Sequence, residues 1–438
     1  MRRVIGIHEK LPVLETLPLS LQHLTAMFGA TVVVPILFGI NPAIALFMNG
    51  IGTLIYTFFT LGGIPAYLGS SFAFLAPTFL IISKYGGFGH AQSGFIFFGL
   101  FFIAVSFIIK YAGIKWIDVV MPAPVMGAVV AIIGLELAPL AAQMAGLAPA
   151  ATDVGKVVQP YVADPNVLTV SLFTLAVGII GTVIFRGFFQ VIPILTAVVF
   201  GYGLATIKGM VNFQAIIDAP WFSLPHFSQP VFDWNAIFII APACLVVLAE
   251  HIGHLIVTGN ITDTDLVKHP GLHRSLLGDG ISNLLSGLAG SPPNTTYGEN
   301  IGVMAITRVY SVWVIRGAAI LAICFSCIGK VAAAIMTIPG PVMGGITILL
   351  YGVIAVAGIR MLVEQKVDFS KNYNMVLAAI TFVIGVSGAS VTIGTVQLKG
   401  MAFAAVSGVI LSIIFYFLDK FGILNEEMGG KSKKKAEA

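Results

Sequence analysis

Two carboxylates and a histidine are the residues best suited to chemistry in this sequence. Glu250 and His254 stand four positions apart, which places them one turn apart on the same face of a helix. Glu299 directly follows Gly298, after a segment with two adjacent prolines. Both regions are apolar enough for a membrane, where a carboxylate costs at least about 2.5 kcal/mol and usually serves a function. The pattern therefore predicts a ligand site with a carboxylate that gains and loses a proton.

The elements that must position these residues are apolar segments of membrane-spanning length. The chain has 438 residues, of which 58% are hydrophobic and 10% are charged, whereas soluble domains carry roughly 25% charged residues. About fourteen segments are long or apolar enough to be counted as spans. Their approximate bounds are 17–39, 42–62, 70–83, 93–112, 117–138, 167–185, 188–208, 235–258, 271–290, 297–309, 312–336, 340–363, 374–388 and 397–421. The third, tenth and thirteenth are too short to cross a bilayer alone.

The distribution of basic residues predicts the orientation of these spans. An even number of spans places both termini on the same side, and Arg2, Arg3 and the lysines of residues 422–438 suggest that this side is the cytoplasm. Of the 23 Lys and Arg residues, five then lie outside and the other 18 lie inside. The five outside are Lys84, Lys156, Lys208, Lys330 and Lys399. This asymmetry favours the assignment over its mirror image.

Charge and cysteine content argue against several other classes of protein. The net charge is only +4 and no basic stripe is present, so we expect no nucleic-acid partner. Cys244, Cys324 and Cys327 lie in apolar runs, and one C-x-x-C pair without further ligands is weak support for a metal. We therefore expect these cysteines to pack between helices, with no metal and no cofactor.

Two halves of the chain carry matching segments in the same order. The sequence MPAPVMG at 121–127 recurs as IPGPVMG at 338–344. Gln22-His23 likewise corresponds to Glu250-His251, and the segment 70–73 corresponds to 296–299. Each half would hold about seven spans, and an odd number makes the second half enter the membrane from the opposite side. The predicted fold is an all-α polytopic membrane protein built as a 7+7 inverted repeat.

The third and tenth spans are interrupted at equivalent places in the two halves. Residues 62–72 (GGIPAYLGSSF) and 290–300 (GSPPNTTYGEN) contain prolines and small polar residues that prevent a continuous helix. Backbone at membrane depth must find partners inside the protein, so we expect these segments to pair as two short strands. The half-helices that follow would present free N–H groups and positive dipole ends to a central site.

Three other ionisable residues within the spans are expected to have structural roles. His251 points about 100° away from Glu250 around a helix and is expected to pack or to form a hydrogen bond. Asp279 and Glu136 are expected to be structural or interface groups.

The chain resembles the nucleobase–ascorbate transporter family. The family signature [Q/E/P]-N-x-G-x-x-x-x-T-[R/K/G] appears as Glu299, Asn300 and Gly302, followed by Thr307 and Arg308. The segments Gln22-His23, SSFAF at 70–74 and AEHIGH at 249–254 also match, so the resemblance covers nearly the whole chain.

This resemblance implies a core domain that moves against a gate domain, in a homodimer. The core would comprise residues 1–115 and 234–337, and the gate residues 116–233 and 338–421, with a cytoplasmic basic tail at 422–438. Both termini would be cytoplasmic, in a multi-pass protein of the plasma membrane.

The resemblance also implies the residues that hold the substrate. Glu250 and Glu299 would bind a nucleobase through their side chains, and Phe72 and Gly298 through backbone N–H groups. Tyr351 would face the site from the gate, and His254 and Glu250 would couple transport to protons. Glutamate at position 299 resembles the uracil branch, so proton-coupled uracil import is expected. The alternatives are a transporter of another nucleobase such as xanthine, or an anion carrier on the same fold. A channel or a membrane enzyme is disfavoured, because no ring of selectivity carbonyls, metal cluster or nucleophile–base pair is apparent.

Overall fold

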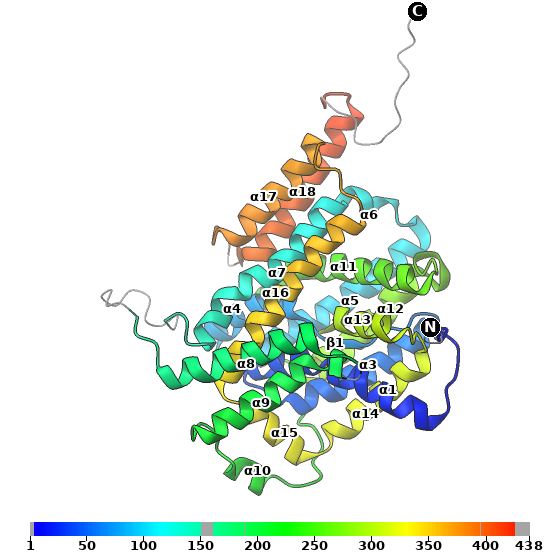
Figure 1. Ribbon diagram of the computed structural model, residues 1–438. Helices are drawn as coiled ribbons and strands as arrows, with labels where there is room; N and C mark the ends of the chain where they lie inside the picture. The colour runs from blue at the N-terminus through cyan, green and yellow to red at the C-terminus, as the bar shows by residue number, and fades with distance from the viewer. Residues whose placement is uncertain (1–3, 150–160, 188, 395, 425–438) are drawn as a thin grey trace, which may run out of the picture.

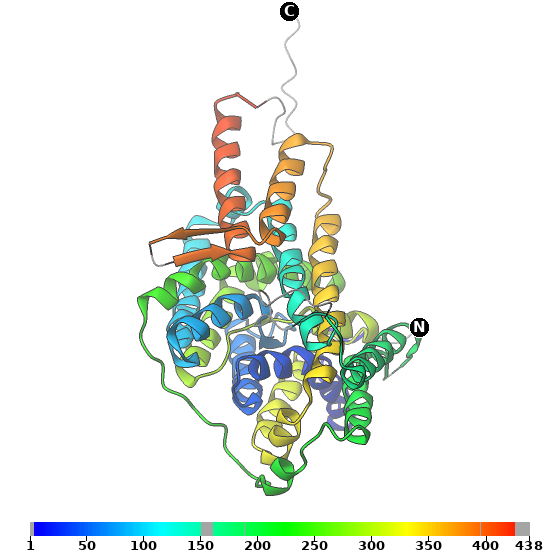
Figure 2. The same ribbon diagram turned by 90° about the vertical axis from the view of Figure 1, so that its left-hand side faces the viewer.

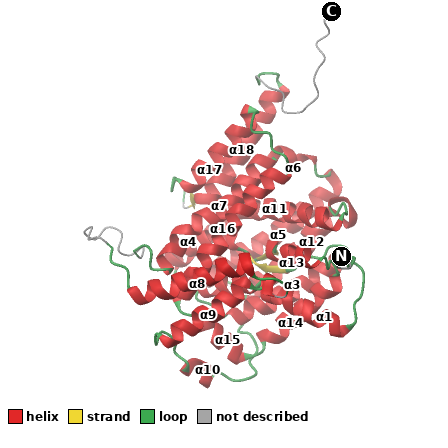
Figure 3. Ribbon diagram, viewed as in Figure 1, coloured by secondary structure: helices red, strands yellow, loops and turns green. Residues whose placement is uncertain are grey.

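The structure is a computed structural model that describes residues 4–149, 161–187, 189–394 and 396–424, so residues 425–438 of the predicted basic tail lie outside it. It is mostly helical (Figure 3). The elements of the first half are α1 (Val13–Ala26), α2 (Phe28–Leu37), α3 (Pro42–Phe59), β1 (Leu68–Ser70), η1 (Phe72–Phe74), α4 (Leu75–Tyr85), α5 (Phe88–Ala112), α6 (Lys115–Val120), α7 (Ala123–Met144), α8 (Pro165–Ile184), η3 (Phe189–Val191), α9 (Pro193–Ile207) and α10 (Gln214–Asp218). Those of the second half are α11 (Trp234–Thr262), η4 (Val267–Gly271), α12 (Leu272–Ala289), β2 (Asn294–Thr296), α13 (Gly298–Thr307), α14 (Val312–Ser326), α15 (Gly329–Met336), α16 (Gly340–Glu364), α17 (Asn372–Val386), β3 (Ser390–Ile393), β4 (Val396–Lys399) and α18 (Gly400–Lys420).

Every predicted span contains a helix, and local sequence explains where several of them begin. Asn41, Asp164 and Asp233 accept a hydrogen bond from the backbone two residues later and so cap α3, α8 and α11. Proline at the first helical position follows Asn41 and Asp164, where its missing N–H group costs nothing.

Eight of the described helices are long and apolar enough to cross a membrane by length and composition. Four shorter apolar helices, at Phe72–Tyr85, Pro193–Ile207, Val312–Ser326 and Asn372–Val386, accompany them. The predictions of a polytopic, helical membrane protein and of short third and tenth spans are therefore confirmed. The number of spans that cross the bilayer, fourteen by sequence, stays a prediction.

Several predicted spans differ from the structure in their continuity: the first divides into α1 and α2, and the fifth into α6 and α7. The eleventh, predicted as one helix over 312–336, divides into α14 and α15. Ile328 adopts an extended conformation there and bridges to Phe222, while the Cys327 carbonyl accepts from the Ser223 N–H at 3.0 Å. The fourteenth begins with strand β4, which pairs with β3 in an antiparallel hairpin that the sequence analysis missed. Figure 2 shows this hairpin projecting to the side of α17 and α18.

Two helix pairs make close backbone contacts near the interrupted segments. Helices α5 and α12 approach at Gly99, and α7 and α16 approach at Gly134. A methyl group at Gly99 would collide with the backbone of Leu284, and one at Gly134 with the carbonyl of Tyr351. Small residues allow such packing in membranes. Figure 1 shows α7 and α16 running side by side, next to the region that contains β1 and α13.

Candidate functional site

The two interrupted segments pair with each other inside the bundle. Strands β1 and β2 are antiparallel, with Leu68 opposite Thr296 and Ser70 opposite Asn294. All six strand residues are buried. The Tyr297 hydroxyl donates to the Ser70 carbonyl at 2.7 Å, which adds a side-chain hydrogen bond between the two segments. The predicted strand pairing is confirmed, and it supplies the internal partners that backbone needs at membrane depth.

Helix starts follow directly on both strands. Phe72 opens η1 after β1, and Gly298 and Glu299 lie in the first turn of α13 after β2. The first N–H groups of a helix have no partner within that helix. The two strands therefore bring two sets of free donors, and the positive end of the α13 dipole, to the centre of the molecule.

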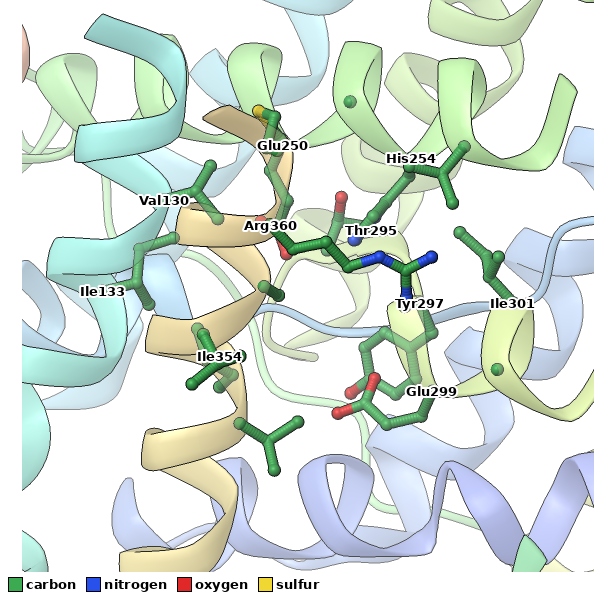
Figure 4. A pocket seen from close by; sticks show the side chains of 18 of the residues that line it. Val130, Ile133, Glu250, His254, Thr295, Tyr297, Glu299, Ile301, Ile354 and Arg360 are labelled. Atoms are coloured by element: carbon green, nitrogen blue, oxygen red, sulfur yellow. The ribbon is translucent and has the colours of Figure 1, made fainter. Parts of the chain in front are cut away.

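A cavity of about 370 Å³ lies between these helix starts and the pair α7 and α16. Glu250 and His254 enter it from α11, Glu299 and Gly298 from α13, and Phe72 from η1. Figure 4 shows Glu250 and His254 on one side of the cavity and Glu299 on another. The opposite wall is apolar and is formed by Val130 and Ile133 of α7 and by Ile354 of α16. Five of the six residues predicted to bind the substrate or the proton thus line the same cavity.

The two cavity carboxylates have no cationic partner in the described part of the chain. The ion pairs found there involve other acidic residues, and Glu250 and Glu299 are in none of them. Both side chains are half-buried. They are therefore available as hydrogen-bond acceptors for a ligand that carries N–H or O–H groups.

His254 is held next to the start of α13. Its Nδ1 lies 3.1 Å from the Thr296 hydroxyl oxygen of β2. A methyl group at Gly298 would lie 3.2 Å from the other ring nitrogen, Nε2, so glycine lets the imidazole approach the helix start. If the Thr296 hydroxyl donates to Nδ1, Nε2–H donates toward the cavity; in the other tautomer Nε2 accepts.

Tyr351, the remaining predicted site residue, lies behind Phe72 rather than on the cavity wall. Its ring meets the Phe72 ring edge-on, with 5.6 Å between centroids and 85° between planes. The side chain is 1% exposed. Its hydroxyl has no hydrogen-bond partner among the described residues. A direct contact between Tyr351 and a ligand therefore stays a prediction.

Apart from Glu299, the residues of the sequence signature divide into one wall residue and residues that anchor or end α13. Gly302 lines the cavity. The Asn300 amide lies 3.0 Å from Nδ1 of His23 and donates to the His23 carbonyl at 3.2 Å, tying α13 to α1. The Thr307 hydroxyl donates to the Val303 carbonyl at 2.8 Å, and Arg308 ends the helix in a left-handed conformation with φ 61°.

The cavity continues to an ion pair that the sequence analysis missed. Arg360 and Glu364 of α16 line it, and Arg360 Nε donates to Glu364 Oε1 at 2.6 Å. The Arg360 side chain is 65% exposed, so this end of the cavity is its mouth. The signal in the sequence was a charged pair four residues apart at the end of the twelfth span. Figure 4 shows the guanidinium group extending in front of the cavity.

His251 and Asp279 lie outside the cavity, in a buried cluster. His251 Nδ1 is 2.9 Å from Asp279 Oδ2, and both side chains are 0% exposed. His251 Nε2 lies 2.8 Å from the Ser275 hydroxyl oxygen, which is 2.6 Å from that of Tyr56. The expectation that His251 packs or forms a hydrogen bond away from Glu250 matches its contact with Ser275.

The described residues contain no cluster of three or more His, Cys, Asp or Glu side chains that could hold a metal ion. The three cysteines are free, and Cys244 is buried. The expectation that the protein needs no cofactor stays a prediction.

Comparison with known proteins places the chain in a family. The sequence model of a permease family, Xan_ur_permease, matches residues 14–394. The chain is 56% identical to a uracil permease of Escherichia coli (strain K12) over 414 residues, which are 94% of each protein. It is 54% identical to a uracil permease of Paenibacillus larvae subsp. larvae over 424 residues, 97% of this chain and 99% of that one.

A solved structure shares the fold. The transmembrane domain of the cyanobacterial bicarbonate transporter BicA superposes with a TM-score of 0.64 at 17% identity, covering 94% of this chain and 99% of that one. At this identity the likeness concerns the fold alone. The sequence matches, however, cover nearly the whole chain, and they confirm the resemblance drawn from the signature at residues 299–308. The chain is therefore a multi-pass membrane protein that belongs to this permease family, the nucleobase–ascorbate transporters.

Proposed function

We propose that this protein imports uracil across the plasma membrane together with protons. The observation that carries the proposal is one cavity that contains two unpaired carboxylates, Glu250 and Glu299, and the free N–H groups of two helix starts. Its volume of about 370 Å³ lies within the range of small-molecule sites, roughly 300–1,000 Å³. The names of the relatives, uracil permeases at 54% and 56% identity, support the same substrate.

The chemistry of uracil matches the polar groups of the cavity. Uracil has two N–H donors and two carbonyl acceptors on one flat ring. The carboxylates of Glu250 and Glu299 would accept from the N–H groups, and the backbone N–H groups at Gly298 and Phe72 would donate to the carbonyls. Sites built to bond a ligand's polar atoms reject analogues that lack those atoms by large factors. The apolar wall of Val130, Ile133 and Ile354 would cover the remaining edge of the ring.

Proton coupling would supply the energy for accumulation. Uracil is neutral at pH 7, so the membrane potential does no work on it. One proton moving through ~100 mV releases about 2.3 kcal/mol. At 1.4 kcal/mol per decade this sustains a gradient of roughly 50-fold. Glu250 and His254 are the groups proposed to exchange the proton, since they line the cavity one helical turn apart.

The division into core and gate provides a route for alternating access. The ligand groups belong to the proposed core (η1, α11 and α13), and the apolar wall belongs to the proposed gate (α7 and α16). A displacement of one against the other would open and close the cavity. The mouth at Arg360 and Glu364 lies at the end of α16 that the charge distribution places in the cytoplasm. We accordingly assign the structure to an inward-facing state with cytoplasmic termini. The family resemblance is the basis on which we propose a homodimer.

Uptake into proteoliposomes tests this function. Labelled uracil should accumulate against its gradient when the interior is made alkaline, and an uncoupler should abolish the accumulation. Xanthine and bicarbonate serve as competitors, one for each alternative substrate class. Competition by xanthine at equal concentration would favour a transporter of another nucleobase. Uptake that stops when the inner and outer uracil concentrations are equal would favour a channel. Two carboxylates facing the cavity would repel bicarbonate, so we expect no competition from it.

A further inference from the structure

A chain of buried polar side chains leads from the residue after Glu250 to strand β2. His251 Nδ1 lies 2.9 Å from Asp279 Oδ2, and Asn283 Nδ2 donates to the other carboxylate oxygen, Oδ1, at 2.9 Å. The same Nδ2 donates to the Asn294 carbonyl at 2.9 Å. All four side chains are 0% exposed. The chain therefore connects α11 to β2 through α12.

The side-chain amide of Asn283 forms hydrogen bonds to strand β2 on the edge of the strand that is not paired with β1. The Ser71 N–H donates to the Pro293 carbonyl and the Tyr297 N–H donates to the Tyr67 carbonyl, so these residues of the second segment face β1. In an antiparallel pair the intervening residue Asn294 turns its peptide groups to the other edge. There its N–H donates to Asn283 Oδ1 at 2.7 Å, while its carbonyl accepts from Asn283 Nδ2.

Asp279 determines which way that amide points. Its Oδ2 lies 2.9 Å from His251 Nδ1, within ion-pair distance, and its Oδ1 accepts from Asn283 Nδ2–H. With Nδ2 held there, Asn283 Oδ1 is left to accept from the Asn294 N–H. An amide at position 279 would place its NH2 group either against the Asn283 NH2 group or beside the His251 ring. The carboxylate is therefore the group that this geometry requires.

A catalytic role for the same cluster is excluded by its burial. Ser275, His251 and Asp279 have the hydrogen-bond order of a hydrolase triad, with 2.8 Å and 2.9 Å between successive partners. Each is 0% exposed, so no substrate can reach the serine. What the cluster does contact is the backbone that carries the site.

We propose that Asp279 and Asn283 are positioning residues that set the separation between Glu250 and Glu299. The first carboxylate stands on α11, next to His251, and the second stands five residues after Asn294, beyond β2. Asp279 contacts His251 of α11, Asn283 bonds to Asn294 of β2, and Asn283 bonds to Asp279, so the two residues link the positions of α11 and β2. The proposal rests on the proposed function: the two carboxylates must match the two N–H groups of uracil at once.

The test compares binding of uracil with binding of 1-methyluracil and 3-methyluracil, each of which lacks one N–H group. Calorimetry would use the purified full chain and the variants Asn283→Ala and Asp279→Asn. Ser286→Ala is the matched control, because Ser286 is 0% exposed on the same helix and its hydroxyl has no partner among the described residues. We expect uracil affinity to fall at least tenfold in both variants and to stay within twofold in the control.

The ratio of uracil to methyluracil affinity separates positioning from simple loss of structure. It should be large in the wild-type protein and fall in both variants, since a site of altered spacing bonds only one N–H group well. Asp279→Glu keeps the carboxylate acceptor, so its ratio of uracil to methyluracil affinity should lie between those of Asp279→Asn and the wild-type protein. The ratio does not depend on the fraction of folded protein. An unchanged ratio in both variants, or loss of all folded protein from both, would overturn the proposal. Wild-type protein that binds no uracil, or does not discriminate, would instead contradict the proposed function.

Discussion

The ring of Phe72 meets the ring of Tyr351 edge-on, with 5.6 Å between their centroids. Phe72 opens η1 and lines the cavity, whereas Tyr351 lies behind it on α16, the helix that contributes Ile354 to the opposite wall. Since η1 belongs to the proposed core and α16 to the proposed gate, this aromatic contact joins the two parts that would move against each other. A contact present in only one conformation contributes to the balance between states.

Replacing Tyr351 by alanine should therefore reduce transport more than binding. We expect uptake of labelled uracil to be lost in proteoliposomes, while binding through Glu250 and Glu299 remains measurable on the same preparation. Tyr351→Phe is the control: it keeps the ring contact and removes a hydroxyl that has no partner among the described residues. It should transport at close to the wild-type rate. Full uptake by Tyr351→Ala would refute a role for this contact.

His254→Ala should impair proton-driven uptake more than equilibrium binding. The imidazole lies one turn from Glu250, and histidine is the side chain that ordinarily changes charge near neutral pH. We expect affinity for uracil to stay within about tenfold, roughly 1.4 kcal/mol, while uptake driven by a pH gradient falls well below wild type. His251→Ala would be a poor control, because His251 bonds to Asp279. Thr258→Val serves instead, since the Thr258 hydroxyl donates only to the His254 carbonyl.

Wild-type uptake by His254→Ala under a pH gradient would show that His254 only packs.

Gly298→Ala should weaken uracil binding through the position of His254. The added methyl group would lie 3.2 Å from His254 Nε2, which is tighter than most carbon contacts and would push the imidazole away from the start of α13. Gly302→Ala is the matched change one turn later on the same helix, where nothing lies within 4 Å of the added group. We expect a loss of about tenfold for the first variant, roughly 1.4 kcal/mol, and less for the second. Equal affinities for both variants in a binding titration would contradict this prediction.

The sequence predicted the interrupted spans well because their signals are local. Prolines and small polar residues before residues 72 and 298 exclude a continuous helix, and the missing backbone partners then imply pairing between the two segments. Glu250 and His254 were found for a related reason, since their helical spacing alone sets them on one face. Charge in an apolar segment is rare enough to be informative without any knowledge of tertiary structure.

The sequence did not predict what depends on contacts between distant elements. Asn283 is a polar residue in a helix of modest hydropathy, and nothing near it shows that its amide pairs with the backbone of Asn294. Asp279 was assigned a structural role, but its bond to His251 required the packing of α11 against α12. The β3–β4 hairpin was missed because residues 390–399 were divided between a loop and a span, although Gly394 marks its turn with φ +63°.

Binding of uracil to Glu250→Gln and Glu299→Gln, measured by calorimetry beside the wild-type protein, tests the central claim most directly. Each change replaces one acceptor oxygen by a donor, and a hydrogen bond to a charged group contributes about 1.5–3 kcal/mol. Affinity should therefore fall roughly 10- to 100-fold in each variant, at 1.4 kcal/mol per decade. Glu364→Gln, at the mouth of the same cavity, is the control and should bind within a few-fold of wild type. Unchanged affinity in both site variants would contradict the assignment of the two carboxylates to the substrate.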